Sequence, residues 1–294
     1  MTTPPADFDI TPALIDALLS AQHPDLLELP RRYLSSGWDN AIYRLGDQYL
    51  LRLPRRAQAV PLLEREQAWL PKLAPRLSIP VPAPVRSGRP QAEFPRPWSV
   101  TPFYPGEPAA AAPPAADEAL RLARFLRELH RPPPPDTPRN PYRGCPLRER
   151  APDTEARLQR LLAAGLITTR VSELWAAALA AHDDRLEPRL LHGDLHPRNL
   201  IVHRGRITAV IDWGDITAGD AATDLAAFWL LFPDAGVRQA ALNHYGADSQ
   251  LRDRSVGWAV FFGALLLEIG LGGDPVFEQV GRRALRHLET LKTC

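Results

Sequence analysis

The segment from Leu190 to Leu225 constrains this chain more than any other part of its sequence. It reads LLHGDLHPRNLIVHRGRITAVIDWGDITAGDAATDL, in which polar side chains lie between short apolar runs. Asp194 follows the first apolar pair, Asn199 comes five residues later, and Asp212 ends the next apolar run. Short apolar runs bounded by polar and turn residues are typical of buried strands. The segment therefore predicts short strands with three polar side chains at their ends.

These polar residues suit phosphoryl transfer, which depends on positioning and charge neutralisation more than on covalent chemistry. Asp194 can orient an acceptor hydroxyl and accept its proton. Asn199 and Asp212 offer hard oxygen ligands for Mg²⁺, and the separation of Asp194 and Asn199 equals that in the catalytic loop of protein kinases. His192 and His196 flank this loop, and we expect them to fix it by hydrogen bonds. His196 is also a weaker candidate for contact with the acceptor.

Two further aspartates in the same segment have a simpler interpretation. Asp220 and Asp224 precede or begin an apolar run, where Asp commonly caps the free amides of a helix. We expect both to be structural. Three of the other histidines, His130, His203 and His287, do not show the spacing of metal ligands, so the sequence does not predict a zinc site.

Composition narrows the class of protein. The 294 residues are 45% hydrophobic and 23% charged, which fits a globular protein of one large domain or two lobes. The net charge of +1 does not favour a nucleic-acid or membrane-surface partner. Cys145 and Cys294 provide no disulfide framework, and no signal-peptide pattern is apparent, so we expect a cytoplasmic protein. The apolar run from Val256 to Leu267 is too short to span a bilayer and predicts a buried helix.

The order of the expected elements predicts an α+β fold in two pieces. The N-terminal piece begins with a helix after Thr11-Pro12, a cap followed by Pro at the first helical position. Its later elements are short strands at 32–34, 41–45, 48–53 and 98–100 and a helix at 61–73. A segment rich in Pro, Gly and Ala at 102–116 separates the pieces. The C-terminal piece has helices at 117–130, at 151–181 and after 224, and strands at 190–191, 200–202 and 207–211.

The run HGDLHPRN, followed by IDWGD and GDAATDLA, resembles the aminoglycoside phosphotransferase and choline kinase superfamily. Arg198 stands where a small residue is usual, Ala221 replaces a Pro, and Asp212-Trp213-Gly214 stands where protein kinases have Asp-Phe-Gly. The resemblance implies a two-lobed protein-kinase-like fold of the α+β class. Residues 1–104 would form a small β-rich nucleotide-binding lobe with a leading helix. Residues 105–294 would form a larger, mainly helical lobe with the catalytic loop and the acceptor site.

The resemblance also implies nucleotide-binding residues in the first lobe. Ser35-Ser36-Gly37-Trp38 matches the position of the phosphate loop, which makes Ser36 and Gly37 candidate nucleotide contacts. Arg52 fills the third-strand position where the family has Lys. Glu66 is its expected partner on the following helix, with Glu64 as the alternative. An Arg keeps the positive charge as a planar fork, which can contact both a carboxylate and a phosphate.

Thr101-Pro102-Phe103-Tyr104 resembles the hinge of the family. The Pro102 carbonyl and the Tyr104 amide would then contact the edge of the purine, while Phe103 or nearby aliphatic residues cover the base.

The resemblance implies an ATP- or GTP-dependent phosphotransferase that uses Mg²⁺ and moves the γ-phosphoryl group to a hydroxyl of a small molecule. The alternative is a catalytically weak or inactive kinase-like nucleotide-binding protein, because Arg52 replaces the usual Lys. A protein kinase is disfavoured, since no activation loop or Ala-Pro-Glu pattern follows Asp212.

The acceptor is not defined by the sequence. After Asp224, seven acidic residues are balanced by seven basic ones, which does not predict a strong trap for a polycation. An aminoglycoside, a macrolide, a sugar and another metabolite all stay open, and antibiotic resistance would follow from the first two. The sequence does not indicate an oligomeric state.

Overall fold

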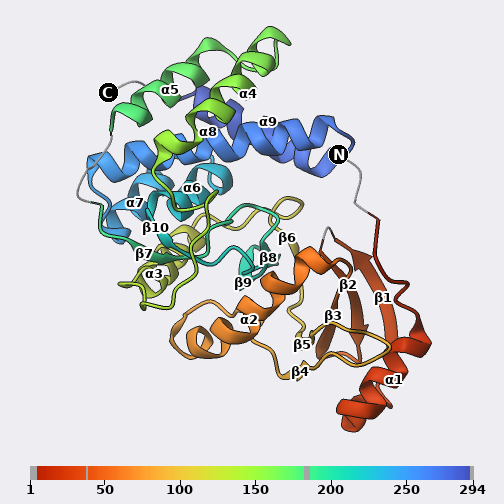
Figure 1. Cartoon of the computed structure of the whole chain (residues 1–294). Helices are drawn as coiled ribbons and strands as arrows, with labels where there is room; N and C mark the ends of the chain where they lie inside the picture. The colour runs from red at the N-terminus through yellow and green to blue at the C-terminus, as the bar shows by residue number, and fades with distance from the viewer. Residues whose placement is uncertain (1–4, 38, 182–185, 292–294) are drawn as a thin grey trace. The chain divides into compact units, whose positions relative to one another are not determined.

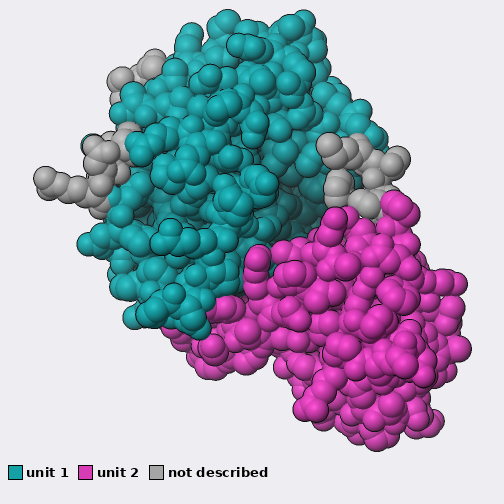
Figure 2. Space-filling view, viewed as in Figure 1, with its two compact units in different colours: residues 1, 77–79, 106–294 teal, residues 2–76, 80–105 magenta. Residues whose placement is uncertain are grey.

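The computed structural model describes residues 5–37, 39–181 and 186–291, and the chain separates into two compact units (Figures 1 and 2). The N-terminal unit comprises residues 2–76 and 80–105, and the C-terminal unit comprises residues 77–79 and 106–294 together with residue 1. The first unit is built on a sheet and the second is mainly helical, which confirms the predicted α+β class (Figure 1).

The N-terminal unit contains an antiparallel sheet with the strand order β1-β2-β3-β5-β4. Its strands are β1 (Arg31–Ser36), β2 (Asn40–Leu45), β3 (Tyr49–Pro54), β4 (Arg86–Gly88) and β5 (Trp98–Pro102). Its helices are α1 (Pro12–Gln22) and α2 (Val60–Leu73), with 3₁₀ turns η1 (Pro24–Leu26), η2 (Ala57–Ala59) and η3 (Ala74–Arg76). The predicted cap of α1 is present, since Thr11 Oγ1 accepts from Leu14 N at 3.2 Å. Strand β4 was not predicted, because its three residues follow a Pro-rich stretch.

Alternation along β2 and β3 gives the sheet two different faces. Leu45, Leu51 and Leu53 are fully buried and pack with α1 in the core of this unit. Because successive side chains of a strand point to opposite faces, Ile42 and Arg52 lie on the other face, and they are directly paired across β2 and β3. The position predicted for the basic residue of the third strand is therefore on the face turned away from this core.

The C-terminal unit consists of helices and short paired strands. The helices are α3 (Glu118–Leu129), α4 (Ala151–Ala163), α5 (Thr169–Ala180), α6 (Ala222–Leu231), α7 (Ala235–Tyr245), α8 (Ser249–Leu271) and α9 (Pro275–Glu289), with the 3₁₀ turn η4 (Leu147–Arg150). The strands are β6 (Glu107–Pro108), β7 (Arg189–Leu191), β8 (Leu200–His203), β9 (Arg206–Val210) and β10 (Thr217–Gly219). β7 pairs with β10, and β8 pairs with both β6 and β9. The single helix expected over 151–181 is two helices, broken where Gly165 adopts a φ of 66°.

Helix α8 forms the centre of the C-terminal unit and packs against α5, α6 and α9. Trp258, Phe262 and Leu267 on α8 are fully buried. The helix is long and apolar enough to cross a membrane by length and composition, but most of its apolar stretch is buried inside the protein. The predicted buried helix at Val256 to Leu267 is therefore confirmed as the core helix of this unit.

Candidate active site

The loop that carries the predicted transfer residues, the HGD loop (residues 192–199), connects β7 to β8. Leu191 at its start pairs with Thr217 of β10, and Leu200 at its end pairs with Val210 of β9. Both ends of the loop are therefore fixed by sheet hydrogen bonds.

Asp224 holds the start of the HGD loop from α6. Its carboxylate accepts the backbone N–H of His192 at 2.7 Å and that of Gly193 at 2.9 Å, and His130 Nε2 lies 3.1 Å from Oδ2. Burial alone would raise the pKa of Asp224, but the hydrogen bond and charge of His130 and the loop contacts outweigh it and lower the pKa. The carboxylate is therefore an ionised acceptor in a fully buried position.

Asp220 and Asp224 both have structural roles, as predicted, but only Asp220 caps free amides at the start of a helix. Asp220 Oδ1 accepts from Ala222 N at 3.0 Å at the start of α6, and its Oδ2 pairs with Arg254 at 2.8 Å. Asp224 instead caps the backbone of a loop that is 31 residues away in sequence. A pattern of Asp at a helix start cannot reveal this contact, because the amides that it satisfies come from another element.

Gly193 is required by the shape of the HGD loop. Its φ is 87°, in the left-handed region, and a Cβ at this position would lie 2.5 Å from the backbone oxygen of Asp215. The close approach of residues 193 and 215 brings the loop against the segment that follows Asp212.

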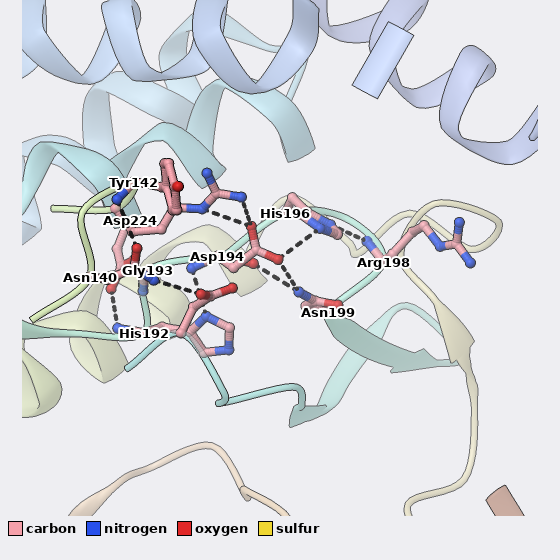
Figure 3. A network of polar contacts seen from close by, with 11 residues as sticks. Asn140, Tyr142, His192, Gly193, Asp194, His196, Arg198, Asn199 and Asp224 are labelled. Carbon is pink, nitrogen blue, oxygen red and sulfur yellow. Dashed lines mark hydrogen bonds and ion pairs between the residues drawn. The ribbon is translucent and has the colours of Figure 1, made fainter. Parts of the chain in front are cut away.

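The Asp194 carboxylate receives four N–H groups from the described part of the chain (Figure 3). Oδ1 accepts from Arg143, with Nη2 at 3.0 Å and Nε at 3.3 Å. Oδ2 lies 3.2 Å from Nδ2 of Asn199 and 3.3 Å from Nε2 of His196. Burial would raise the pKa of Asp194, but the interactions with His196 and Arg143 outweigh burial and hold this pKa far below its usual range.

Arg143 was not predicted from the sequence. It lies 51 residues before Asp194, in the loop that precedes η4, and no motif marks it. This loop is fixed to β10 and to the start of α6: Asn140 N donates to Thr217 Oγ1 at 3.0 Å, and Asp220 N donates to the Gly144 carbonyl at 2.9 Å. Arg143 therefore reaches Asp194 from an anchored backbone.

Asn199 and Asp212 are brought together by the β8–β9 hairpin. The ladder continues past Leu200, since Ile211 N donates to the Asn199 carbonyl at 2.9 Å, so Asn199 lies opposite the neighbour of Asp212. Asn199 Nδ2 donates to the Asp194 carbonyl at 2.9 Å, which leaves the amide oxygen Oδ1 to accept. Asp212 is exposed and has a φ of 66°, a strained backbone region that often marks functional sites.

The donor chemistry of Asn199 and Asp212 fits Mg²⁺. Both offer hard oxygen atoms, and Mg²⁺ in nucleotide enzymes is typically held by one or two such side chains together with phosphate oxygens and water. No group of three or more His, Cys, Asp or Glu residues is placed to hold a metal in the described ranges. An ion at Asn199 and Asp212 would take its other ligands from phosphate oxygens and water.

Both histidines of the HGD loop fix its geometry, as predicted. His192 Nδ1 accepts from Asp194 N at 3.2 Å, and its Nε2 lies 3.0 Å from the Ile211 carbonyl. His196 Nδ1 accepts from Arg198 N at 3.2 Å. Because each Nδ1 accepts, the ring nitrogen that donates is Nε2. His196 therefore donates to Asp194, while His192 ties the loop to the strand end before Asp212.

Arg198, the departure from the family pattern, contacts the turn between α8 and α9. Its Nη1 lies 2.9 Å from Asp274 Oδ2, and its guanidinium lies 4.0 Å from the centre of the Phe277 ring. Asp274 also caps α9 by accepting from Val276 N and Phe277 N. The substitution thus links the HGD loop to the start of α9.

In the N-terminal unit, Arg52 and Glu66 form an ion pair with a distance of 2.5 Å between Nη1 and Oε2. Both side chains are largely removed from solvent, with 12% and 3% exposure. Glu66, the preferred candidate, is therefore a partner of Arg52, whereas Glu64 is exposed on α2.

The hinge candidates lie where β5 ends. Phe103 N donates to the Gln48 carbonyl at 2.7 Å, so the backbone groups of Phe103 face β3. Backbone groups alternate in direction along a strand, so the Pro102 carbonyl, at the end of β5, faces the opposite edge. The guanidinium of Arg44 lies 3.2 Å from the centre of the Phe103 ring, at the wall of a cavity of about 430 Å³ in this unit.

The candidate phosphate loop connects β1 to β2. Ser36 ends β1, and its Oγ accepts from Tyr33 Oη at 2.9 Å. Gly37 N donates to the Asn40 carbonyl at 3.0 Å, and Arg55 donates to the Gly37 carbonyl. Trp38, the other predicted loop residue, lies outside the described residues, and so do Cys294 and Lys292.

The architecture of the two units is that of protein-kinase-like phosphotransferases. The structure of the GDP complex of aminoglycoside 2'-phosphotransferase-IIIa matches with a TM-score of 0.69 and 19% identity, over 95% of this chain and 99% of that one. The macrolide 2'-phosphotransferase MphH from Brachybacterium faecium matches with a TM-score of 0.61 and 24% identity, over 96% of this chain and 100% of that one. At these identities the matches establish the fold.

Sequence comparison identifies the family. The model of the phosphotransferase enzyme family matches residues 31–257, and the chain belongs to this family. A curated relative, the uncharacterized protein YcbJ of Bacillus subtilis (strain 168), is 26% identical over 208 residues. This match covers 64% of the present chain, and the chain spans 64% of the length of that relative.

Proposed function

We propose that this protein transfers the γ-phosphoryl group of ATP or GTP to a hydroxyl group of a small molecule. The observation that carries the proposal is the grouping of Asp194, Asn199 and Asp212: a carboxylate and two metal-type oxygen donors held by one loop and one hairpin. Membership of the phosphotransferase enzyme family supports the reaction type.

Asp194 acts as the base in this reaction. Its carboxylate orients the acceptor hydroxyl and takes its proton as the hydroxyl oxygen forms a bond to the γ-phosphorus. The bond between the γ-phosphorus and the β–γ bridging oxygen breaks, and the nucleoside diphosphate leaves. Asn199 and Asp212 would hold Mg²⁺, which supplies charge neutralisation on the phosphate oxygens.

The N-terminal unit supplies nucleotide contacts in this proposal. Arg52, oriented by Glu66, contacts a phosphate oxygen, because the planar guanidinium can serve a carboxylate and a phosphate together. Ser36 and Gly37 cover the phosphates, and the Pro102 carbonyl and Tyr104 amide contact the base. Solved structures of similar fold hold GDP and ADP, which supports a nucleotide co-substrate.

The acceptor class is proposed at the level of small hydroxyl compounds. Among the proteins of similar fold, an APH(2'')-IIIa structure contains kanamycin and an APH(2'')-IIa structure contains gentamicin, and others are macrolide 2'-phosphotransferases. These names describe those proteins, and they support a small-molecule acceptor for this chain.

The test is transfer of label from γ-labelled ATP and GTP with Mg²⁺, with water and a panel of hydroxyl compounds as acceptors. We expect label transfer or nucleotide hydrolysis that Asp194→Asn reduces at least ~10²–10³-fold, while Mg-nucleotide still raises the melting temperature. Asp136→Asn, an exposed acid in the loop before Arg143, is the control and should leave the rate unchanged. Nucleotide binding with no Asp194-dependent turnover would instead support the inactive nucleotide-binding alternative.

A further inference from the structure

Arg143 contacts the proposed base, Asp194, directly. Two of its N–H groups, one on Nη2 and one on Nε, donate to Asp194 Oδ1. A carboxylate offers about four lone-pair positions. Arg143 fills two on Oδ1, and Asn199 and His196 fill two on Oδ2. An acceptor hydroxyl can therefore donate to Asp194 only after one of these donors moves.

Arg143 is the donor that can move most readily. The Asn199 amide also donates to the Asp194 carbonyl, and His196 is held at Nδ1 by Arg198 N. Arg143 instead makes its hydrogen bonds to Asp194 Oδ1 through a flexible side chain. Its guanidinium lies 5.6 Å and 5.2 Å from the ring centres of Phe261 and Phe262, so it can slide over an aromatic surface without losing its packing.

The remaining donors of Arg143 suit an anion. A guanidinium carries five N–H groups, and Asp194 takes two of them. The side chain is 15% exposed, so part of it reaches solvent. A carboxylate or a phosphate matches this planar edge with two parallel hydrogen bonds.

The carboxylates near Arg143 already accept hydrogen bonds, so they do not offer a free binding site to a cationic acceptor. Asp274 is engaged by Arg198 and by the first amides of α9. Asp215 accepts from Asn140 Nδ2 at 2.6 Å, and burial together with the charge of Asp194 raises the pKa of Asp215. A polycationic acceptor would thus meet carboxylates that are already paired, beside the positive charge of Arg143.

We propose that Arg143 binds the acceptor directly and selects hydroxyl compounds that carry a carboxylate or phosphate group. The anionic group draws the guanidinium from Asp194 Oδ1, and the vacated lone pair receives the acceptor hydroxyl. This inference rests on the proposed phosphotransfer reaction. It sets the chain apart from those proteins of similar fold that are named for aminoglycosides.

The test uses four sugars that differ in charge on one ring: D-glucosamine, D-glucose, D-glucuronate and D-glucose 6-phosphate. With the wild type, kcat/KM should be highest for glucuronate or glucose 6-phosphate, and the higher of these two identifies carboxylate or phosphate as the selected group. Arg143→Gln should lower kcat/KM for the preferred anionic sugar ~10–100-fold and leave that for glucose unchanged or raised. Arg139→Gln, an exposed arginine of the same loop, should preserve the wild-type order.

Calorimetric binding of glucuronate and glucose 6-phosphate without nucleotide separates this inference from the reaction itself. Wild type and Asp194→Asn should bind the preferred anionic sugar, and Arg143→Gln should bind it at least ~10-fold more weakly. If the anionic sugars bind but no Asp194-dependent turnover is found, the proposed reaction is refuted and anion binding by Arg143 still stands. The role of Arg143 would be overturned if Arg143→Gln lowered binding or turnover by the same factor for all four sugars, or raised it for all four. It would also be overturned if the wild type preferred glucosamine or bound neither anionic sugar.

Discussion

Asp224 accepts the backbone N–H of Gly193 at 2.9 Å across 31 residues of sequence, so a helix residue sets the conformation of the HGD loop. The same carboxylate accepts from His192 N, and both contacts are buried. The position of Asp194 therefore depends on a residue that never touches the proposed substrate.

Asp224→Asn should lower both activity and stability. The amide replaces one accepting oxygen by an NH₂ group, which cannot accept the loop N–H and leaves a buried donor unsatisfied. We expect the free energy of unfolding to fall by about 2–4 kcal/mol and kcat to fall at least ~10-fold. Denaturant unfolding and steady-state kinetics measure the two effects. Asp234→Asn, an exposed cap of α7, is the matched control and should cost about 1 kcal/mol or less without changing kcat.

Asp224 should also make the free energy of unfolding depend on pH in the acid range. Its pKa in the folded protein is lowered, so its contribution is fully present above the unfolded value of about 3.9. That contribution is lost as the pH falls through the folded pKa. Unfolding measured between about pH 6 and pH 3 should therefore show a steeper acid loss for the wild type than for Asp224→Asn. Parallel curves for the two proteins would show that His130 and the loop amides do not stabilise the carboxylate.

Gly193→Ala should damage the site through the backbone. The new Cβ would lie 2.5 Å from the Asp215 carbonyl at a φ of 87°, so the loop must shift. We expect a loss of about 2–4 kcal/mol and a fall in kcat of at least ~10-fold. Gly165→Ala is the control, because its φ is 66° but a Cβ there meets nothing within 4 Å. It should cost about 1 kcal/mol and leave kcat unchanged, and equal kcat values for both variants would contradict the account.

Arg52 should act on the nucleotide. Arg52→Ala removes the positive charge and leaves Glu66 buried, so KM for nucleotide should rise ~10–100-fold and stability should fall. Arg52→Lys restores a cation beside Glu66 and should recover most of this loss. Initial rates over a range of Mg-nucleotide concentrations measure both, with the exposed Arg89→Ala as control. A KM that stays constant in Arg52→Ala would exclude a phosphate contact.

The elements that local pattern determines were predictable. Short runs between turn residues marked β2 and β3, a cap and Pro marked the start of α1, and a long apolar run marked α8. The pairing of Arg52 with Glu66 followed from the resemblance to the family, and the loop contacts of His192 and His196 followed from their positions beside Asp194.

Contacts that depend on the fold as a whole were not predictable. Arg143 reaches Asp194 from a loop without a motif, positioned by Asn140 and Gly144 contacts to β10 and α6. Asp224 resembles a helix cap in sequence because it lies in the first turn of α6. Its partners come from a distant loop, which the local sequence does not reveal. The break at Gly165 falls inside a helix-favouring composition, and a single Gly does not reveal a left-handed φ in advance.

The most direct test of the central claim compares wild type with Asp194→Asn in transfer of the γ-phosphoryl group from labelled Mg-ATP and Mg-GTP. We predict that the wild type transfers label to a small-molecule hydroxyl and that Asp194→Asn does so at least ~10²–10³-fold more slowly, although both bind Mg-nucleotide equally well. Equal transfer rates, or nucleotide binding by the wild type without Asp194-dependent transfer to any acceptor including water, would contradict the account.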